Sequence, residues 1–564
     1  MTSNPAAVES PAVERPVFPF GAGATVSPLP GEERLGGKGH HLCVMSDLGL
    51  PVPPGFILET ELCRRYSVEK KLPGDLPDLL TWALADLGRR SGRSFWSEEN
   101  PLLVSVRSGS VVSMPGMLET ILNVGLNDRS VEGLADSSGN PRFAWDSYRR
   151  LVTSFGTTVH GIPRRRFDEL FESLKRQAGL VLDREVDAEG HREAVSRALA
   201  LFEAVVGKPF PQDPMAQLLE AIEAVLRSWW GARAVEYRRY HGIPDADGTA
   251  VTVQAMVFGN RGYASGSGVA FTRNPSVGTR GLYVDFLWNA QGDDIVSGGV
   301  DPDSGEELLR YLPGVHQKLL EYGRILENHF RDMQDMEYTV EEGGLYLLQT
   351  RRGKRTALAA VQIALDLAEE GVIDRAEALR RIRGIPPDAV RQPELQIPEG
   401  AAPLVQGEVA SIGSVAGRLA LSSEAARKFK REGAPVVLVR PETRTEDLEG
   451  IIQADAIVTS RGGRTSHAAV VARHLGKACV VGCSRLEIDE GARLVRAADR
   501  EIREGEWISV DGRTGGVYAG RFESRMREED PAVEKARAWA RELGLGDHPL
   551  LGAGSAARPR EAAS

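Results

Sequence analysis

Cysteine is scarce in this chain of 564 residues. The sequence contains four, and no two of them are spaced as a CxxC pair or followed by histidines at zinc-finger intervals. A disulfide scaffold and a structural zinc site are therefore not expected. We predict free thiols at Cys43, Cys63, Cys479 and Cys483.

Long apolar runs are missing as well. A membrane-spanning helix needs about 18 or more consecutive apolar residues, and the sequence has no such stretch. The N-terminus is rich in polar, proline and alanine residues and lacks the charged and then apolar pattern of a signal peptide. The sequence therefore predicts a cytoplasmic protein without a membrane segment. Its ends, residues 1–16 and the tail from residue 552, are predicted to be disordered.

A dense cluster of positive charge is absent too. Lysine and arginine number 69 against 79 aspartate and glutamate residues, which gives a formal net charge of -10. Nucleic acid is therefore not expected as a main partner, whereas small anions in local basic pockets are plausible ligands. The chain has 564 residues, of which 42% are hydrophobic, and this is enough to form about three or four domains or subdomains.

The sequence pattern divides the chain into four segments. In residues 17–356, strand-like runs alternate with long amphipathic stretches, which is typical of a multi-lobed α+β nucleotide domain with a helical insert. Residues 357–404 predict two helices and then a semi-stiff, proline-rich linker. In residues 405–522, short β runs alternate with helices and predict a compact second domain of α/β type. Residues 523–564 predict one helix, about Pro531 to Leu543, and leave no room for a barrel of about 250 residues.

One histidine carries the clearest chemical signal. His467 ends the segment Gly-Gly-Arg-Thr-Ser-His and precedes an alanine-rich stretch that predicts a helix start. Glycines let the backbone approach an anion, hydroxyls can hydrogen-bond to it, and a helix N-terminus stabilises its charge. A neutral imidazole is a good nucleophile near pH 7. We therefore predict that His467 carries a phosphoryl group, rather than being a core histidine, in a loop formed by Gly462, Gly463, Thr465 and Ser466.

A second set of polar residues lies on two neighbouring strands. Asp335 and Glu337 are two residues apart, so both side chains point to one face of a strand. After a turn at two glycines, the return strand carries Gln349 and Arg351 with the same spacing. Carboxylate and amide oxygens together with substrate phosphates are usual ligands of Mg²⁺, and an arginine would balance polyphosphate charge. The spacing alone leaves open a solvated strand face with a surface ion pair.

Two glycine-rich turns precede these strands, and each is a weak signal alone. Leu35–Gly39 offers Lys38, and Ser105–Ser110, followed by Met114–Met117, offers Arg107. Both turns could cradle phosphates, although neither fits the P-loop or the Rossmann fingerprint.

Taken together with the His467 motif, these segments resemble the pyruvate phosphate dikinase family, within the wider group of phosphoenolpyruvate-utilising enzymes. The resemblance covers about residues 17–522. It is carried by Leu35 to Phe56, Pro101 to Asp128, Phe143 to Ile162, Phe210 to Asn260, Gly266 to Gly292, Asp332 to Thr356, Arg440-Pro441-Glu442-Thr443 and Asp447.

This resemblance implies an ATP-grasp-like nucleotide domain with a helical insert, followed by a swivelling β/α phosphohistidine domain. It implies that Lys38 and Arg107 bind the phosphates of ATP and act with His467 in catalysis. It also implies that Asp335, Glu337, Gln349 and Arg351 hold metal and polyphosphate, with Mg²⁺ at the first three. Attack at the β-phosphorus of ATP, leaving AMP, is implied as well, and the co-substrate is orthophosphate or water.

The sequence departs from the family pattern at three places. Arg464 stands where the family usually has methionine, so the edge of the histidine pocket is more basic. Val300 stands where the family commonly has arginine before Thr-Pro. The family also continues into a C-terminal barrel that binds pyruvate or phosphoenolpyruvate, and no segment after residue 522 matches it. We therefore expect a separate chain to supply that barrel, or another acceptor to be used.

The function predicted from the sequence is ATP-dependent phosphorylation of His467 and onward phosphoryl transfer, by a phosphotransferase with paired acceptors. The expected ligands are ATP, orthophosphate and Mg²⁺, with pyruvate or phosphoenolpyruvate as the further pair, and a homodimer is possible. Two alternatives stay open: phosphoryl transfer to another small molecule, as in the related rifampin phosphotransferases, and a non-catalytic regulatory partner that keeps the fold. Intact Lys38, Arg107, Asp335, Glu337 and His467 argue against the last of these.

Overall fold

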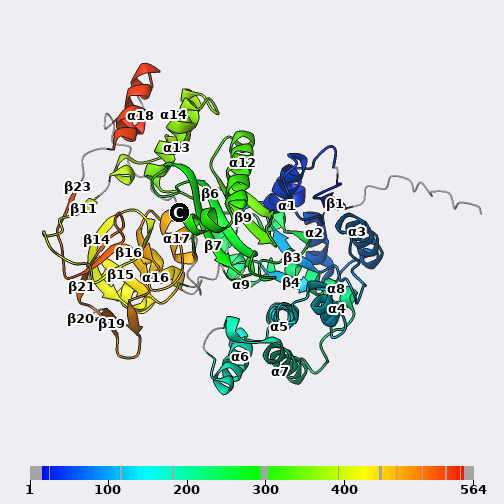
Figure 1. The fold of residues 1–564 in the computed structure, drawn as a ribbon. Coiled ribbons are helices and arrows are strands. Elements are labelled where there is room, and N and C mark those ends of the chain that lie inside the picture. The colour runs from blue at the N-terminus through cyan, green and yellow to red at the C-terminus, as the bar shows by residue number, and fades with distance from the viewer. Residues whose placement is uncertain are drawn as a thin grey trace, which may run out of the picture. The chain divides into compact units, whose positions relative to one another are not determined.

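A computed structural model of the chain is drawn in Figure 1. It describes residues 16–24, 26–112, 114, 117–180, 183–292, 294, 303–391, 393–443, 447–464, 466–497, 500–526, 530–545 and 548–551. The chain forms two compact units, one of residues 1–257 with Tyr346–Gln349 and one of residues 258–345 with 350–564. We call them the N-terminal and the C-terminal unit. Their boundary falls inside the predicted nucleotide domain, and the predicted domain limits stay a prediction.

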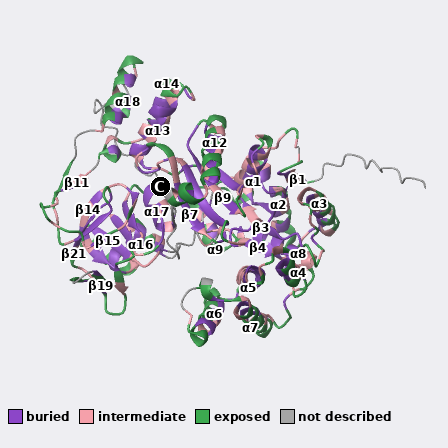
Figure 2. Cartoon of the chain, in the orientation of Figure 1, coloured by how far each residue is buried: buried purple, intermediate pink, exposed green. Residues whose placement is uncertain are grey.

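An antiparallel sheet in the order β1-β2-β5-β3-β4 forms the centre of the N-terminal unit. Its strands are β1 (Val17–Phe20), β2 (Gly55–Leu58), β3 (Val104–Gly109), β4 (Thr120–Val124) and β5 (Ala250–Ala255). Every residue of β2 and β5 is buried. In Figure 2 the sheet is mostly purple with some pink, whereas the helices around it show green outer faces. This unit is therefore a helix-covered sheet.

Helices cover the sheet of the N-terminal unit. Helices α1, α2, α5 and α8 contact the sheet, and α5 also packs on α7. The helical insert stays a prediction from the sequence. The helix bounds are α1 (Glu32–Asp47), α2 (Thr60–Glu69), α3 (Leu76–Ser91), α4 (Ser130–Ser138), α5 (Pro141–Thr158), α6 (Arg164–Ala178), η1 (Asp183–Glu185), α7 (Ala188–Val206), α8 (Pro214–Ser228), α9 (Ala232–His241) and η2 (Asp245–Asp247).

A buried histidine on helix α7, His191, is expected to give the N-terminal unit a pH-dependent stability. His191 stacks on Phe171 with 5.7 Å between the ring centroids, and its Nδ1 lies 3.8 Å from Oδ1 of Asp146. Burial lowers the pKa of His191 to about 4, although the Asp146 carboxylate opposes the shift. The unfolded chain therefore binds more protons than the folded one between about pH 6.5 and pH 4, so the stabilisation is complete above pH 6.5 and is lost as the pH falls towards 4.

Replacing His191 by leucine should flatten this part of the pH profile. A shift of this size corresponds to about 3 kcal/mol of unfolding free energy. The wild type is therefore expected to lose that much more stability than His191→Leu when acidified from pH 7 to pH 4, measured from thermal unfolding at each pH. His241, which is exposed at the end of α9, provides the control variant His241→Leu. Equal losses in wild type and His191→Leu would contradict the assignment.

The first sheet of the C-terminal unit has the order β10-β9-β6-β7-β8. On one of its faces α12 packs so closely that a Cβ added at Gly323 would lie 3.0 Å from Thr272 and 3.5 Å from Met336. The opposite face holds Val269 and Phe271, which share an apolar core with α13. The bounds are β6 (Gly266–Arg273), β7 (Arg280–Trp288), β8 (Asp303–Ser304), α11 (Gly305–Tyr311), α12 (Pro313–Phe330), β9 (Gln334–Glu341) and β10 (Gly344–Arg352).

A second, larger sheet carries His467. Its order is β12-β22-β21-β14-β15-β16-β17-β13, and β14 to β17 run parallel to one another. Apolar cores lie on both faces, as parallel strands require, and helices α15 to α17 alternate with these strands along the chain. The predicted β runs are strands in the structure. The bounds are β12 (Val405–Gln406), β13 (Glu408–Ser411), β14 (Ser414–Ala420), α15 (Ser423–Arg431), β15 (Val436–Arg440), α16 (Leu448–Gln453), β16 (Ala456–Thr459), α17 (His467–His474), β17 (Ala478–Val481), β21 (Trp507–Asp511) and β22 (Gly516–Ala519). A smaller antiparallel sheet adds β18 (Glu487–Asp489), β19 (Leu494–Ala497) and β20 (Arg500–Arg503).

The proline-rich linker is more structured than the sequence predicted. The two helices before it are present, but the linker itself forms a short helical turn and a strand, β11, which pairs with β23 antiparallel. The predicted C-terminal helix, α18, packs on α13 in one apolar core with Val390 of the linker. The linker and the last segment therefore belong to one layer, because the apolar stripe of α18 is buried there. The bounds are α13 (Ala357–Glu369), α14 (Arg375–Ile382), η3 (Pro387–Val390), β11 (Pro393–Leu395), β23 (Ser524–Met526), α18 (Pro531–Glu542) and η5 (Pro549–Leu551).

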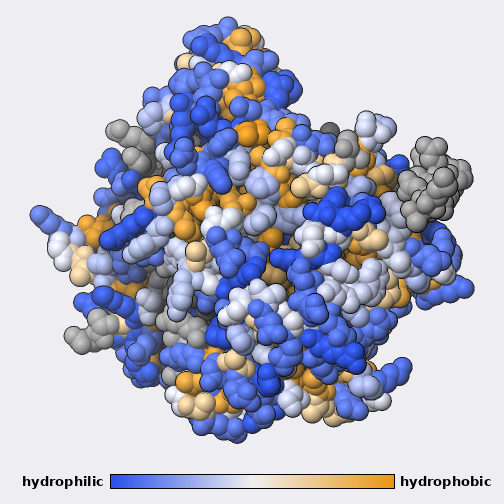
Figure 3. Space-filling model, turned by 45° about the vertical axis from the view of Figure 1, so that its right-hand side comes forward, coloured by the Kyte–Doolittle hydropathy of each residue, from blue (hydrophilic) through white to orange (hydrophobic). Residues whose placement is uncertain are grey.

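The surface matches the charged composition. On the face drawn in Figure 3, hydrophilic side chains cover most of the molecule and hydrophobic ones form scattered patches. None of the helices in the described part of the chain has the length and apolar character needed to cross a membrane. The four cysteines are free and buried.

Candidate functional site

His467 is the first residue of helix α17, as the motif predicts. Ser466 is the N-cap, with extended backbone angles (φ -60°, ψ 163°), and Gly462 has a φ of 90°, which favours glycine. The imidazole Nδ1 lies 3.1 Å from the hydroxyl of Thr443, which follows strand β15. The Oγ of Ser466 is buried and has no hydrogen-bond partner among the described residues. A half-buried histidine is thus held at a helix N-terminus beside an unsatisfied hydroxyl.

Four polar side chains share one face of the sheet that contains β6. Phe271 pairs with Asp335 on one side and Tyr283 on the other, and Val269 pairs with Glu337 and Asp285. Because alternate residues of a strand point to the same face, these pairs form two rows across three strands. We call this surface the acidic face; its members are Tyr283, Asp285, Asp335, Glu337 and, from β10, Arg351.

The arginine of the acidic face bridges the two carboxylates predicted from the sequence. Nε of Arg351 lies 2.7 Å from Oδ2 of Asp335, and Nη2 lies 3.9 Å from Oε1 of Glu337. Burial raises the pKa of Asp335, although Arg351 opposes the shift, while the Asp335 carboxylate raises the pKa of Arg351. The other oxygen of Asp335, Oδ1, is buried without a hydrogen-bond partner in the described part of the chain. A buried oxygen without a partner is costly, which favours a ligand, a metal ion or a water molecule beside it.

Helix α17, which begins at His467, lies against this face. The guanidinium of Arg473, which is 2% exposed, sits 5.4 Å from the ring centroid of Phe271, the residue that pairs with Asp335 and Tyr283. Its Nη1 donates hydrogen bonds to the carbonyl oxygens of Ala410 (2.9 Å) and Arg464 (2.8 Å). Burial lowers the pKa of Arg473, although the nearby Asp285 and Asp335 carboxylates oppose this shift. The histidine-bearing helix therefore packs on the acidic face through Arg473, and both belong to the C-terminal unit.

A metal at this site would depend on few protein ligands. No group of three or more histidine, cysteine, aspartate or glutamate side chains that could hold a metal occurs among the residues described. Two carboxylates with an orphaned oxygen fit Mg²⁺, which usually takes one or two carboxylates and completes its shell with water and substrate phosphates. Gln349, the third predicted ligand, lies on β10 two residues before Arg351 and is 9% exposed.

The two predicted phosphate turns adjoin each other in the N-terminal unit, but neither is the loop that the sequence suggested. Lys38 lies inside helix α1, which is interrupted at Gly36 (φ 67°), and Arg107 lies on strand β3. A Cβ at Gly36 would fall 1.9 Å from the carbonyl oxygen of Gly109, and the amide of Gly37 donates to the Ser110 carbonyl at 3.1 Å. Glycine is required here because two backbones touch. The Nε of Arg107 is buried without a partner among the described residues.

Sequence reasoning missed three residues of the site and could not place others. Asp285 and Tyr283 have the same i, i+2 spacing as Asp335 and Glu337 and could have been found by that signal. Arg473 could not have been found from the sequence, because it reaches the acidic face only through the packing of helix α17 on that face. Four residues singled out from the sequence, Pro115, Gly116, Val300 and Thr465, lie outside the described residues.

The fold and the site define a mixed α/β multidomain protein that combines a nucleotide-domain sheet with a histidine-bearing β/α domain. The family model described as "Pyruvate phosphate dikinase, AMP/ATP-binding domain" matches residues 64–306 and 315–371, and "PEP-utilising enzyme, mobile domain" matches residues 433–515. The chain belongs to the pyruvate phosphate dikinase family.

Curated relatives agree with this membership. Pyruvate, phosphate dikinase of Clostridium symbiosum is 45% identical over 514 residues, covering 90% of this chain and 58% of the relative. The enzymes of Rhizobium meliloti (44% identical, 93% of this chain, 60% of the relative) and Arabidopsis thaliana (42%, 93% and 55%) are similar. The chain spans little more than half the length of these relatives.

Proposed function

We propose that this chain uses ATP to phosphorylate His467 and then passes the phosphoryl group on, as the names of its relatives suggest. The observation that carries the proposal is the position of His467 at the start of a helix that packs on the acidic face through Arg473. A nucleophile, an anion-stabilising helix end and a row of carboxylates with arginine are the parts that phosphoryl transfer uses.

The contact with Thr443 supports a role for the other ring nitrogen. When Nδ1–H donates to the Thr443 hydroxyl, the lone pair of the imidazole is on Nε2, which is then the nucleophile. Attack of Nε2 on the β-phosphorus forms an N–P bond and breaks the bond from that phosphorus to the AMP oxygen. Orthophosphate would then remove the terminal phosphate as pyrophosphate, or water would remove it as orthophosphate.

The remaining predicted residues have supporting roles in this proposal. Mg²⁺ held by Asp335, Glu337 and Gln349 would neutralise charge on the phosphates. Lys38 of helix α1 and Arg107 of strand β3, in a proposed ATP-grasp-like domain, would bind phosphate oxygens. Arg351 fixes the two carboxylates in place, since it is paired with both.

ATP labelled at the β or the γ position tests the proposal. The wild-type chain should take up label from both positions without orthophosphate, and with orthophosphate it should keep the β label, release the γ label as pyrophosphate and produce AMP. The label on the protein should be labile to acid and stable to base. A chain that releases only ADP, or takes up no label, would overturn the proposal.

Pyruvate is the proposed final acceptor of the phosphoryl group. The test is whether label on His467 is lost faster when pyruvate is added, with phosphoenolpyruvate as the product. Label on His467 that pyruvate leaves unchanged contradicts this part of the proposal. The cytoplasmic location and the homodimer stay predictions from the sequence.

A further inference from the structure

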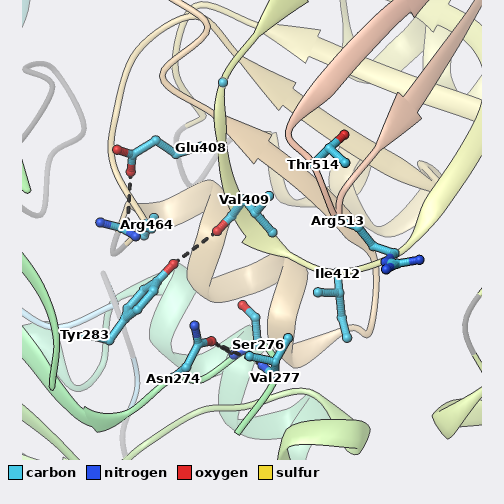
Figure 4. A pocket seen from close by; sticks show the side chains of 11 residues that line it. Asn274, Ser276, Val277, Tyr283, Glu408, Val409, Ile412, Arg464, Arg513 and Thr514 are labelled. Atoms are coloured by element: carbon cyan, nitrogen blue, oxygen red, sulfur yellow. Dashed lines mark hydrogen bonds and ion pairs between the residues drawn. The ribbon is translucent and has the colours of Figure 1, made fainter. Parts of the chain in front are cut away.

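An arginine three residues before His467 fastens the histidine loop to the sheet that bears the acidic face. Nε of Arg464 lies 3.0 Å from Oε2 of Glu408 on β13 and 3.5 Å from Oδ1 of Asp285 on β7. Its guanidinium also lies 4.3 Å from the ring centroid of Tyr283. Figure 4 shows the side chains of Arg464, Glu408 and Tyr283 converging at one end of a cavity.

Strand β13, which carries Glu408, is held to the sheet that bears the acidic face. The hydroxyl of Tyr283 donates to the carbonyl of Val409 at 3.1 Å, and Oγ of Ser276 donates to the carbonyl of Ala410 at 3.0 Å. Arg473 donates to the Ala410 and Arg464 carbonyls, so the loop and strand β13 share one fixed support. These hydrogen bonds hold β13 on the sheet of the acidic face. The side chain of Arg464 connects that sheet to the segment that precedes His467.

Arg464 also balances the charge of the carboxylates that it contacts, Asp285 and Glu408. Asp285 is 1% exposed, and a buried carboxylate is costly unless a cation faces it. A planar guanidinium can pair with two carboxylates and stack on an aromatic ring at once, which an ammonium cannot. The cavity beside it, about 400 Å³, leaves the side chain of Arg464 23% exposed. The contact is therefore only partly screened by water.

We infer that Arg464 is a positioning residue: its pair with Asp285 holds the Gly462–Arg464 segment on strand β7, its pair with Glu408 ties the same segment to β13, and together they aim His467 at the acidic face. This inference rests on the proposed phosphorylation of His467. Arg464 touches none of the residues proposed to bind ATP, so its loss should slow phosphoryl transfer and leave the ATP requirement unchanged. A nucleophile displaced by about 1 Å can lose about 10²-fold in rate.

The test is a single-turnover measurement of label on His467 over a range of ATP concentrations. Arg464→Met keeps a long side chain and removes the charge, and it should lower the maximal rate by about 10- to 100-fold. The ATP concentration for half-maximal rate should change less than about twofold, because ground-state binding is intact. The matched control is Arg427→Met on helix α15 of the same domain, which breaks an exposed 2.9 Å pair with Glu449 of α16 and should match wild type.

A double-mutant cycle then asks whether Arg464 acts through Asp285. Asp285→Asn should also slow labelling, and the double variant should be no slower than the slower single variant. Independent, multiplying losses would overturn the role of Asp285, and an Arg464→Met rate within about twofold of wild type would overturn the inference.

Two further results keep the test decisive. If Arg464→Met does not fold, as judged by its thermal unfolding, then Glu408→Gln and Arg464→Lys replace it. Both should show reduced maximal rates with an unchanged ATP requirement, and wild-type rates would refute the inference. A wild-type chain that takes up no label refutes the proposed function instead, so the two failures can be told apart.

Discussion

Alanine in place of His467 is expected to abolish the uptake of label from ATP. The imidazole is the only group at the start of α17 that combines a lone pair near neutral pH with a helix N-terminus and a hydroxyl partner on its other nitrogen, among the residues described. Without it no N–P bond can form, so the loss should be complete rather than partial. The measurement is acid-labile, base-stable label on the purified chain after incubation with ATP.

Two companion variants separate chemistry from folding. His467→Asn keeps a polar side chain that can bond to Thr443 at the first helical position, and it should also take up no label. Thr443→Val removes only the group that orients the ring, and a loss of about tenfold is expected, the size of a missing hydrogen bond. Label that survives in His467→Ala would end the assignment of this residue.

Removing either carboxylate of the acidic face is expected to lower the phosphorylation rate by about 10² or more, through lost charge stabilisation of the transferring group. Asp335→Asn should be the more severe, since Asp335 is 3% exposed, pairs with Arg351 at 2.7 Å and has the orphaned oxygen. Its loss leaves the Arg351 guanidinium without its closest partner. Glu337→Gln, whose carboxylate lies 3.9 Å from Arg351, tests the metal role with less disturbance.

Single-turnover rates at several Mg²⁺ concentrations measure this effect. Both variants should need more Mg²⁺ than wild type as well as being slower. Glu341→Gln, on the same strand but paired with Arg261 at 2.8 Å, is the control and should keep the wild-type rate. An unchanged rate in Glu337→Gln would show that the acidic face is a structural ion-pair surface.

The parts of the site that could be predicted from the sequence are those set by local geometry. The two-residue spacing of Asp335 and Glu337 places both beside Arg351, and the Gly-Gly-x-Thr-Ser-His pattern starts α17 at His467. Local patterns also marked the strands and the paired helices α13 and α14.

The parts that could not be predicted depend on contacts between distant segments. Lys38 was expected in a flexible turn, but the touching backbones of Gly36 and Gly109 place it in a helix that is broken by one left-handed residue. The linker was expected to be a semi-stiff, proline-rich spacer, yet its strand β11 pairs with β23, about 130 residues later in the chain. Arg473 looked like an ordinary helix residue, because no local sequence pattern predicts that Phe271 and Asp335 are its neighbours.

The pairing of β11 with β23 has a consequence for any movement of the histidine domain. The chain enters this domain through Leu395 and leaves it through Ser524, which are register partners, and the amide of Gln396 donates to the carbonyl of Glu523 at 2.8 Å. The domain is therefore a closed loop tied at its base. While β11 and β23 stay paired, the histidine domain can turn only about this pair of strands. His467 then moves on an arc whose radius is its distance from the pair. Pro386 and Pro387 lie before that base, so the length of the chain around them does not change this radius.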